Sequence, residues 1–221
     1  LHPHQASIGH MTQDMDYDGY RGDLNTRGVT IAEVLKSSGY STYMSGKWHV
    51  TRNIRAEGPD DCWPCKRGFD RYFGILAGAA HFWNPKTLTR DNTPISVEEF
   101  PEDFFLTDAI SDHAAGFIQS HSESETDEPF FLYTAYTSPH WPLHAHQEDI
   151  EKYKGRFAGG WDQLREERIQ RMRKMGIIKD TWALTDRDAS QVAWDEVEHK
   201  EWQQRRMEVY AAQIDRMDQG I

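Results

Sequence analysis

The chain has 221 residues, a formal net charge of −11 at pH 7 and 38% hydrophobic residues. A chain of this length can bury a sizeable hydrophobic core. Its negative charge argues against nucleic acid or an anionic membrane surface as a partner, because neither would be attracted to it. The charge does not exclude a small anionic ligand, which needs only a local cluster of positive groups.

The sequence lacks the features of a membrane or targeting segment. No apolar run reaches the ~18 residues that a membrane span needs, and no signal peptide opens the chain. The chain starts at Leu1 without an initiator Met and stops at Ile221 within a helical pattern. We therefore expect it to be an internal part of a longer protein.

The first predicted helix starts at Thr30, which has capping-box spacing with Glu33. One helical face is apolar, formed by Ile31, Val34 and Leu35. Gly39 supplies a helix stop, and residues 40–45 follow as a short strand that runs into the tetrapeptide 46–49. A helix followed at once by a strand predicts an α/β fold, with a mostly parallel sheet flanked by helices.

A second unit of the same kind comes later in the chain. Residues 108–120 have helical spacing of apolar positions, formed by Ile110, Ala114, Phe117 and Ile118. Residues 121–128 are polar and predict a loop. Residues 130–136 form a near-continuous apolar run, which is typical of a strand covered on both faces, and the polar segment 137–142 follows.

The remaining segments give weaker signals. Residues 53–105 are rich in Pro, Gly, Asp and Asn and predict long loops. Asp162 is a plausible cap for a helix that Gly176 ends, and a longer helix is predicted from about residue 188 to 217. The candidate core positions of that longer helix are Val192, Val197, Val209, Tyr210, Ile214 and Met217.

Two predicted strands therefore end in polar, titratable residues. In open α/β sheets the carboxyl ends of the strands are where ligands bind. In an extended segment Lys47 and His49 point the same way, so both face one anion while Trp48 turns into the core. The alternative is an exposed lysine and a histidine that only satisfies a backbone carbonyl.

Several further motifs occur in a fixed order along the chain. They are Arg67-Gly68-Phe69-Asp70 with Phe73-Gly74, Pro129-Phe130-Phe131 leading to Ser138-Pro139-His140-Trp141-Pro142-Leu143, Tyr153-Lys154-Gly155-Arg156-Phe157, and Tyr210-Ala211-Ala212 with Asp215-Arg216-Met217-Asp218. Together with residues 30–49 and the opening Leu1-His2-Pro3-His4-Gln5-Ala6, they resemble the type I sulfatases of the alkaline phosphatase superfamily. The resemblance spans essentially the whole chain.

The resemblance implies an alkaline phosphatase-like fold and hydrolysis of a sulfate monoester, either an aryl sulfate or a sulfated sugar. In that family a hydrated formylglycine, made from a Cys/Ser-x-Pro-x-Arg motif, attacks the sulfate ester, and a calcium ion polarises the sulfate oxygens. Carried over position by position, the resemblance assigns Lys47, His49 and His140 as catalytic residues. It favours a periplasmic or extracellular location, with a cytoplasmic one as the alternative.

Other parts of the family's machinery are absent from this sequence. Neither Cys62, Cys65 nor any Ser stands in the nucleophile motif. The resemblance places that motif before residue 1 and a second pair of metal ligands after residue 221. We therefore expect residues 1–221 to be part of a single catalytic domain. We expect them to lack the formylglycine nucleophile and a complete calcium site, and to be inactive alone.

The expected roles follow from side-chain chemistry. Lys47 stabilises negative charge on the sulfuryl group, while His49 and His140 share the transfer of protons, in an order that the sequence leaves open. Two alternatives to a sulfatase remain. One is a phosphonate or phosphate monoester hydrolase of the same superfamily, and the other is a non-catalytic binder of sulfated glycans.

Three weaker patterns have simpler explanations. Cys62-Trp63-Pro64-Cys65 resembles a redox pair but lacks the preceding strand and following helix, so two half-buried thiols are expected. His2, His4 and His10 lack the partners of a zinc site. The tryptophans that suggest a sugar-stacking wall are more often packing residues; they are Trp83, Trp141 and Trp161.

Overall fold

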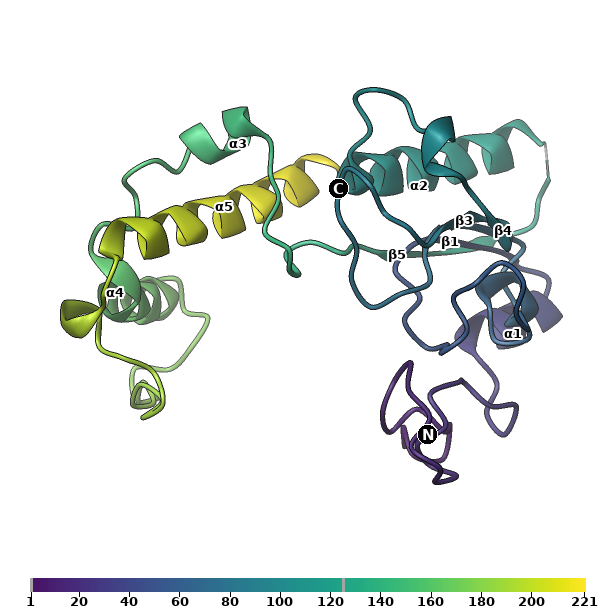
Figure 1. Ribbon diagram of the computed structural model, residues 1–221, viewed down its shortest axis with the longest axis horizontal. Coiled ribbons are helices and arrows are strands. Elements are labelled where there is room, and N and C mark those ends of the chain that lie inside the picture. Colours follow the sequence, from purple (N-terminus) through teal and green to yellow (C-terminus); the bar gives the residue numbers. More distant parts are fainter. Residues whose placement is uncertain (1, 125) are drawn as a thin grey trace. The chain divides into compact units, whose positions relative to one another are not determined.

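The computed structural model describes residues 2–124 and 126–221, so Leu1 of the opening motif and Glu125 of the predicted loop lie outside the described residues. The chain forms two compact units (Figure 1). The first runs to Pro142 and includes Arg216–Ile221, and the second is Leu143–Asp215. Among the described residues no helix is both long and apolar enough to cross a lipid bilayer.

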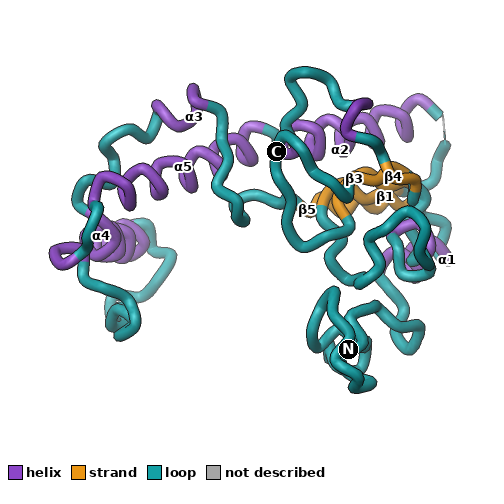
Figure 2. Tube along the Cα trace, in the orientation of Figure 1, coloured by secondary structure: helices purple, strands orange, loops and turns teal. Residues whose placement is uncertain are grey.

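The first unit is built on an open sheet, whose described strands have the order β4-β3-β2-β1-β5 (Figure 2). The strands are β1 Ser41–Gly46, β2 Arg71–Ile75, β3 Leu88–Arg90, β4 Thr93–Pro94 and β5 Phe130–Ala135. β1 pairs in parallel with β2 and with β5, while β3 and β4 add antiparallel pairs beyond β2. The predicted α/β fold is confirmed, because a sheet with a parallel centre lies between helices.

Helices α1 (Ile31–Ser37) and α2 (Leu106–Glu123) lie on opposite faces of this sheet (Figure 1). The capping box at Thr30 is confirmed, and Gly39 follows the helix with a φ of 84°. The predicted apolar face of α1 is wrong, since Ile31 is 67% exposed and Ala32 is the buried residue. The helix is oriented instead by its polar cap, because Thr30 donates a hydrogen bond to the carbonyl of the buried Arg67.

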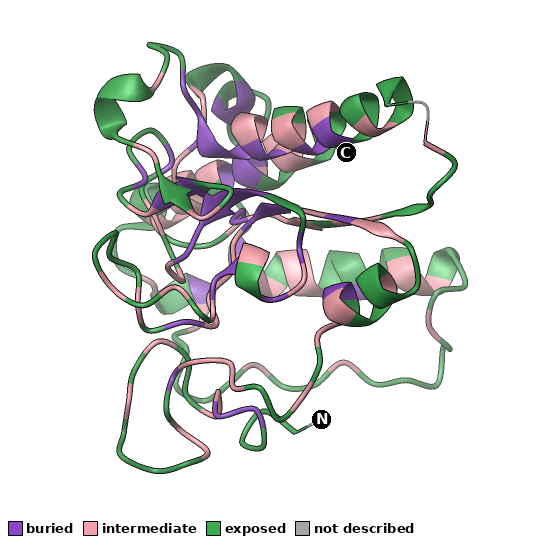
Figure 3. Ribbon diagram, turned by 90° about the vertical axis from the view of Figure 1, so that its right-hand side faces the viewer, coloured by how far each residue is buried: buried purple, intermediate pink, exposed green. Residues whose placement is uncertain are grey.

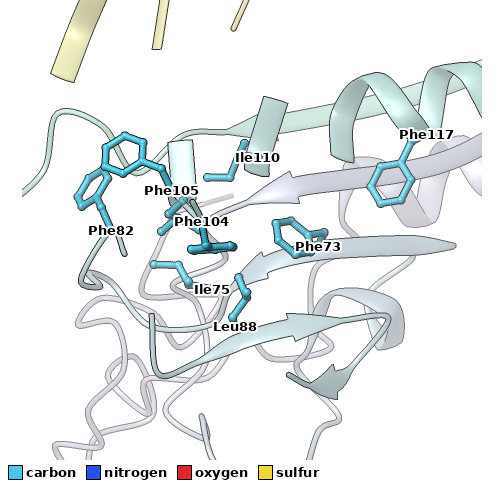
Figure 4. Close-up of a cluster of buried hydrophobic side chains, with 9 residues drawn as sticks. Phe73, Ile75, Phe82, Leu88, Phe104, Phe105, Ile110 and Phe117 are labelled. Carbon is cyan, nitrogen blue, oxygen red and sulfur yellow. The ribbon is translucent and has the colours of Figure 1, made fainter. Parts of the chain in front are cut away.

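Strand β2 separates two hydrophobic clusters by alternation of its side chains. Phe73 and Ile75 pack with Leu88 and the aromatic residues around the start of α2 (Figure 4). Tyr72 and Leu76 belong to the cluster on the α1 side, with Ala32, Met44, Trp63 and Phe69. Figure 3 shows that buried residues concentrate in the strands between the helices. This strand is therefore the centre of the core, because successive side chains point to opposite faces.

The prediction of long loops over residues 53–105 is wrong, because β2, β3 and β4 lie within it. The short helices η1 (Pro64–Lys66) and η2 (Val97–Glu99) lie there as well. β3 and β4 have 3 and 2 residues, too few to show a period in the sequence. They form because the antiparallel partner supplies the hydrogen bonds, which local sequence does not reveal.

The prediction that residues 130–136 are covered on both faces is also wrong for the described chain. β5 is the edge strand of the sheet, and Phe130 and Tyr133 are 39% and 47% exposed. α2 ends at Glu123, three residues beyond the predicted end, so it takes over part of the predicted loop. An apolar sequence shows which side chains a strand could bury. Tertiary packing decides which of them are buried.

The second unit contains α3 (Gln147–Glu151), α4 (Gly160–Lys174), η3 (Trp194–Glu196) and most of α5 (Lys200–Gln219). Gly176 follows α4 with a φ of 70°, as expected of a helix stop. Asp162 lies inside the first turn of α4 and does not cap it. Its carboxylate instead accepts hydrogen bonds from Trp194 N at 2.8 Å and Arg187 Nε at 3.1 Å.

The longer predicted helix begins twelve residues late, at Lys200, and its core positions were partly wrong. Tyr210 and Ile214 are exposed, and Val192 lies outside the helix and is also exposed. The buried residues of α5 are Glu208, Ala212 and Gln213. Glu208 is buried because its carboxylate accepts a hydrogen bond from Gly155 N at 2.9 Å, a contact between distant segments.

Candidate active site

The candidate site begins where β1, β2 and β5 end side by side. Gly46 and Gly74 have φ values of 125° and 156°, which side chains other than glycine rarely adopt. A Cβ on Gly46 would lie 2.0 Å from the Ala135 carbonyl oxygen, and one on Gly74 would lie 1.7 Å from the Gly46 carbonyl oxygen. These two glycines let the three strand ends approach closely, and so fix the base on which the site is built.

The segment after β1 crosses from the end of β5 to the end of β2. Lys47 N donates to Ala135 O at 2.8 Å, Trp48 N donates to Ile75 O at 2.9 Å, and His49 N donates to Leu76 O at 3.1 Å. Each residue of the motif is therefore tied to a neighbouring strand end. The backbone places Lys47 beside β5 and His49 beside β2.

Trp48 turns inward, as the sequence predicts. Its ring packs on the cluster that contains Met44 and Trp63, and its Nε1 donates to the Cys62 carbonyl at 2.7 Å. The prediction of a fully extended segment is wrong, because His49 has a φ of 62°. The imidazole is thus aimed by a left-handed backbone turn and not by simple strand alternation.

His140 lies in the polar segment after β5. Its backbone N donates to Thr137 O at 2.9 Å, and its Nδ1 lies 2.7 Å from Trp141 O. A carbonyl oxygen only accepts, so Nδ1 carries the proton in this bond. Ser138 anchors the segment to α2 through a 3.0 Å hydrogen bond between its hydroxyl and that of Thr107.

The electrostatics link the three predicted site residues. Burial lowers the pKa of His49, and the positive charges of Lys47 and His140 lower it further. Burial likewise lowers the pKa of Lys47. Lys47 and His140 therefore both lie within electrostatic reach of the His49 ring, although 91 positions separate the two histidines. Three groups that repel one another when protonated are stabilised by an anion bound among them.

Gly78 is a site residue that the sequence reasoning missed. A Cβ on Gly78 would lie 2.2 Å from Nε2 of His49. The imidazole is therefore seated against the backbone of the loop after β2. The signal in the sequence was the run of small residues 77–80, which follows directly after the buried Leu76.

The described residues do not form a metal site. Among them, no group of three or more His, Cys, Asp or Glu side chains is placed to hold a metal ion. A calcium ion needs six to eight oxygen ligands, so the donors present do not fit the ion that the resemblance implies. We derive no catalytic step through it.

The histidines near the start of the chain bind one another. Nδ1 of His2 and Nδ1 of His4 lie 2.8 Å apart with stacked rings, and Nε2 of His4 lies 2.6 Å from the Tyr20 hydroxyl.

The two cysteines are free and half-buried, as expected. The Cys62 thiol donates to Leu24 O at 3.2 Å. Burial raises the pKa of the Cys62 thiol, and it raises the pKa of the Cys65 thiol to about 11. A redox thiol requires the opposite shift. Cys62 lies just before η1 and Cys65 lies within it, so both thiols are packing residues around this short helix.

Of the three tryptophans, Trp83 and Trp141 belong to the first unit and Trp161 to the second. Trp161 packs edge-on against Trp194 at 4.8 Å within the second unit. Trp83 packs on Phe105 in a tilted arrangement, with ring centroids 5.0 Å apart, and is 38% exposed, while Trp141 is 55% exposed next to His140 in the sequence. A sugar-stacking role stays a prediction for these tryptophans. A separate hollow of about 480 Å³ in the second unit is lined mainly by polar and charged residues, among them the ion pair of Asp162 and Arg187.

Comparison with known proteins places this geometry in context. The sequence model of the family described as "Sulfatase" matches residues 1–221. The chain is 33% identical to an uncharacterized sulfatase of Schizosaccharomyces pombe, covering 99% of this chain and 42% of the relative. It is 30% identical to an arylsulfatase of Klebsiella aerogenes, covering 98% of this chain and 47% of the relative. The chain thus spans less than half the length of these two relatives.

The fold is also found among solved structures. The crystal structure of Ps i-CgsB in complex with k-i-k-neocarrahexaose superposes with a TM-score of 0.56 and 22% sequence identity, covering 90% of this chain and 36% of that one. At this identity the likeness concerns the fold alone.

Proposed function

Because the chain belongs to the sulfatase family, we propose that the protein containing it hydrolyses a sulfate monoester and releases inorganic sulfate. The supporting observation is that the His49 ring lies within electrostatic reach of both Lys47 and His140. The similarity to an arylsulfatase supports an aryl sulfate as the substrate, with a sulfated sugar as the alternative.

The overall reaction transfers the sulfuryl group from the alcohol to water. The bond between sulfur and the ester oxygen breaks, an oxygen from water ends on sulfur, and the alcohol leaves with a proton. No residue of this chain is assigned as the nucleophile, because no Cys or Ser stands in the expected motif. The residues of this chain bind the sulfuryl oxygens and move protons.

Lys47 supplies the positive charge of the proposed site. Its ammonium group is half-buried, so its interaction with an anion is less screened by water than that of a surface lysine. Charge that builds on the sulfuryl oxygens and the leaving oxygen in the transition state is stabilised by such a fixed cation.

The two imidazoles have different proposed roles. The pKa of His49 lies below its ordinary value, so His49 is neutral at pH 7 and accepts a proton. Nδ1 of His140 holds a proton against Trp141 O, so proton exchange with a substrate is assigned to the other ring nitrogen, Nε2. We assign the proton that the leaving alkoxide takes to this nitrogen.

The test measures turnover of an aryl sulfate by the full-length protein. Lys47→Ala is expected to lower kcat by about 10²–10³, the usual cost of losing one electrostatic contact to the transition state. Lys66→Ala, which removes an exposed lysine, is the matched control and should retain turnover. A folded Lys47→Ala variant with normal turnover would remove the assignment.

The same assay separates the alternatives. An aryl phosphate turned over with a higher kcat/KM than the aryl sulfate would identify a phosphate monoester hydrolase. Binding of a sulfated sugar by the full-length protein without turnover of any ester would identify a glycan binder. The activity of residues 1–221 alone, expected to be absent, is measured in parallel.

A further inference from the structure

His49 has an unusual backbone conformation for a histidine. Its φ of 62° lies in the left-handed region, which non-glycine residues adopt at an energetic cost. Such a conformation persists only where the surrounding structure enforces it. On the N-terminal side the enforcement is visible, because Trp48 N and His49 N bind the carbonyls of Ile75 and Leu76.

On the C-terminal side the enforcement comes from one carboxylate. Oδ1 of Asp23 accepts hydrogen bonds from the Thr51 hydroxyl at 2.9 Å and from Arg52 N at 2.8 Å. Oδ2 of Asp23 pairs with Arg52 Nε at 2.7 Å. The next residue, Leu24, donates its N–H to Val50 O at 3.0 Å. Residues 50–52 are thus held at every position by Asp23 and its neighbour.

The burial of this contact makes it stiff. Thr51 is 0% exposed, and its hydroxyl donates to a charged acceptor, so the bond is poorly screened by water and stronger than one between neutral groups. Asp14 also pairs with the Arg52 guanidinium, but its contacts differ from those of Asp23. It binds the Arg52 side chain and the Arg21 side chain, but its hydrogen bonds do not reach the backbone of residues 50–52.

We propose that Asp23 is a positioning residue for His49. By fixing residues 50–52 it holds His49 in the left-handed conformation that seats the imidazole against Gly78 and close to Lys47 and His140. The inference rests on the proposed function of His49 and adds to it a residue that lies 26 positions earlier in the chain.

Loss of Asp23 is expected to let His49 relax toward a negative φ, which moves the ring away from Gly78. Misplacement of a catalytic group by ~1 Å costs on the order of 10² in rate. Lys47 keeps its own backbone bond to Ala135, so binding of the sulfate should change less than turnover. We therefore expect Asp23→Ala to lower kcat with little change in KM.

The experiment is a double-mutant cycle in the full-length protein, with turnover of an aryl sulfate as the readout. Asp23→Ala, His49→Ala and the double variant are compared, with Asp14→Ala as the matched control. Asp23→Ala should lower kcat by about 10–10² alone and by less than about threefold in the His49→Ala background, because it acts through His49. Asp14→Ala should retain turnover within about fivefold, because the Asp14 carboxylate binds the Arg52 side chain, whereas Asp23 also binds the Thr51 hydroxyl and Arg52 N.

A second readout separates positioning from general loss of stability. The acid limb of the kcat/KM profile of Asp23→Ala should move toward the ordinary histidine value as the ring leaves its buried position. If Asp23→Ala does not fold, Thr51→Val and Asp23→Asn are compared in the same cycle, since each removes part of the same contact. Asp23→Asn is expected to retain more turnover than Thr51→Val, because the Asn amide keeps one acceptor oxygen for the Thr51 hydroxyl and Arg52 N.

The outcomes are distinguishable. A His49→Ala variant with full turnover would overturn the proposed function of His49. The inference about Asp23 would be overturned by a different set of results. His49→Ala would lower turnover, Asp23→Ala would lower it by the same factor with and without His49, and the acid limb would not move. The proposed function of His49 would then remain intact.

Discussion

Gly78 lies against the His49 imidazole so closely that a single methyl group at Gly78 would come within 2.2 Å of Nε2. This separation is far below any normal contact, so the ring and the added methyl group cannot keep their places together. The loop after β2, which contains Gly78, therefore determines the position of the His49 imidazole.

Gly78→Ala is expected to displace the His49 ring and to lower kcat for an aryl sulfate by about 10² in the full-length protein. The matched control is Gly116→Ala in α2, where nothing lies within 4 Å of the new Cβ. The control should retain activity and gain up to about 1 kcal/mol of stability, because Ala is the better helix former. Full activity of Gly78→Ala would show that the ring has no fixed seat.

The pH dependence of the site follows from His49. Burial, and then the charges of Lys47 and His140, hold its pKa below the ordinary value of 6.5. A proton acceptor must be neutral, so kcat/KM should hold its plateau through pH 6.5 and fall only as the pH drops through the lowered pKa. Bound sulfate should raise that pKa, because a negative charge favours the imidazolium.

The same shift affects stability in a defined direction. Below pH 6.5 the unfolded chain binds a proton at His49 that the folded protein does not, so the stability from this residue is lost as the pH falls toward the folded pKa. Titration of ¹⁵N-labelled histidines by NMR, with and without sulfate, measures the pKa. A sulfate-free value at or above the ordinary one contradicts the prediction.

The thiols of Cys62 and Cys65 should react slowly in the native protein. With its pKa raised to about 11, Cys65 is a thiolate in only roughly a thousandth of molecules at pH 8. A thiol reagent should therefore modify Cys65 slowly before unfolding and rapidly after it. Cys62→Ala and Cys65→Ala should each leave turnover nearly unchanged, in contrast to Lys47→Ala. A cysteine variant that is folded by thermal melt but inactive would restore a catalytic role for the thiols.

Arg67 is expected to be a principal stability determinant of the first unit. Its side chain is 4% exposed, pairs with Glu33 at 2.9 Å, and donates to the carbonyls of Leu24, Asn25 and Gly28. Arg67→Met removes a charged donor from Glu33 and from each of three carbonyls in a buried place, and should cost about 3–5 kcal/mol of the free energy of unfolding. Urea unfolding of the full-length protein measures the loss.

Arg171→Met provides the comparison for that measurement. Arg171 is 59% exposed and lies 3.8 Å from Glu167, so its removal should cost less than about 1 kcal/mol. Equal urea midpoints for the two variants would contradict the assigned role of Arg67.

Much of the candidate site could be predicted because its residues follow elements with strong local signals. Lys47 and His49 come directly after a strand that a capped helix precedes, and His140 follows an apolar run of strand length. Gly78 and Asp23 could not be found in this way. Gly78 acts through its contact with His49, and Asp23 acts through its contact with Arg52. In each pair the two residues are 29 positions apart, beyond the reach of local sequence patterns.

The sequence by itself determined the local events of this protein: the capping box at Thr30, the helix stop at Gly39, and the strand that delivers Lys47. Each depends on hydrogen bonds or φ preferences within a few residues. Only the tertiary structure decided that residues 88–94 extend the sheet, that β5 is an exposed edge, and that His49 takes a left-handed turn. Those features depend on partners far along the chain, whose contacts with Asp23, Arg67 and the strand ends outweigh local preference.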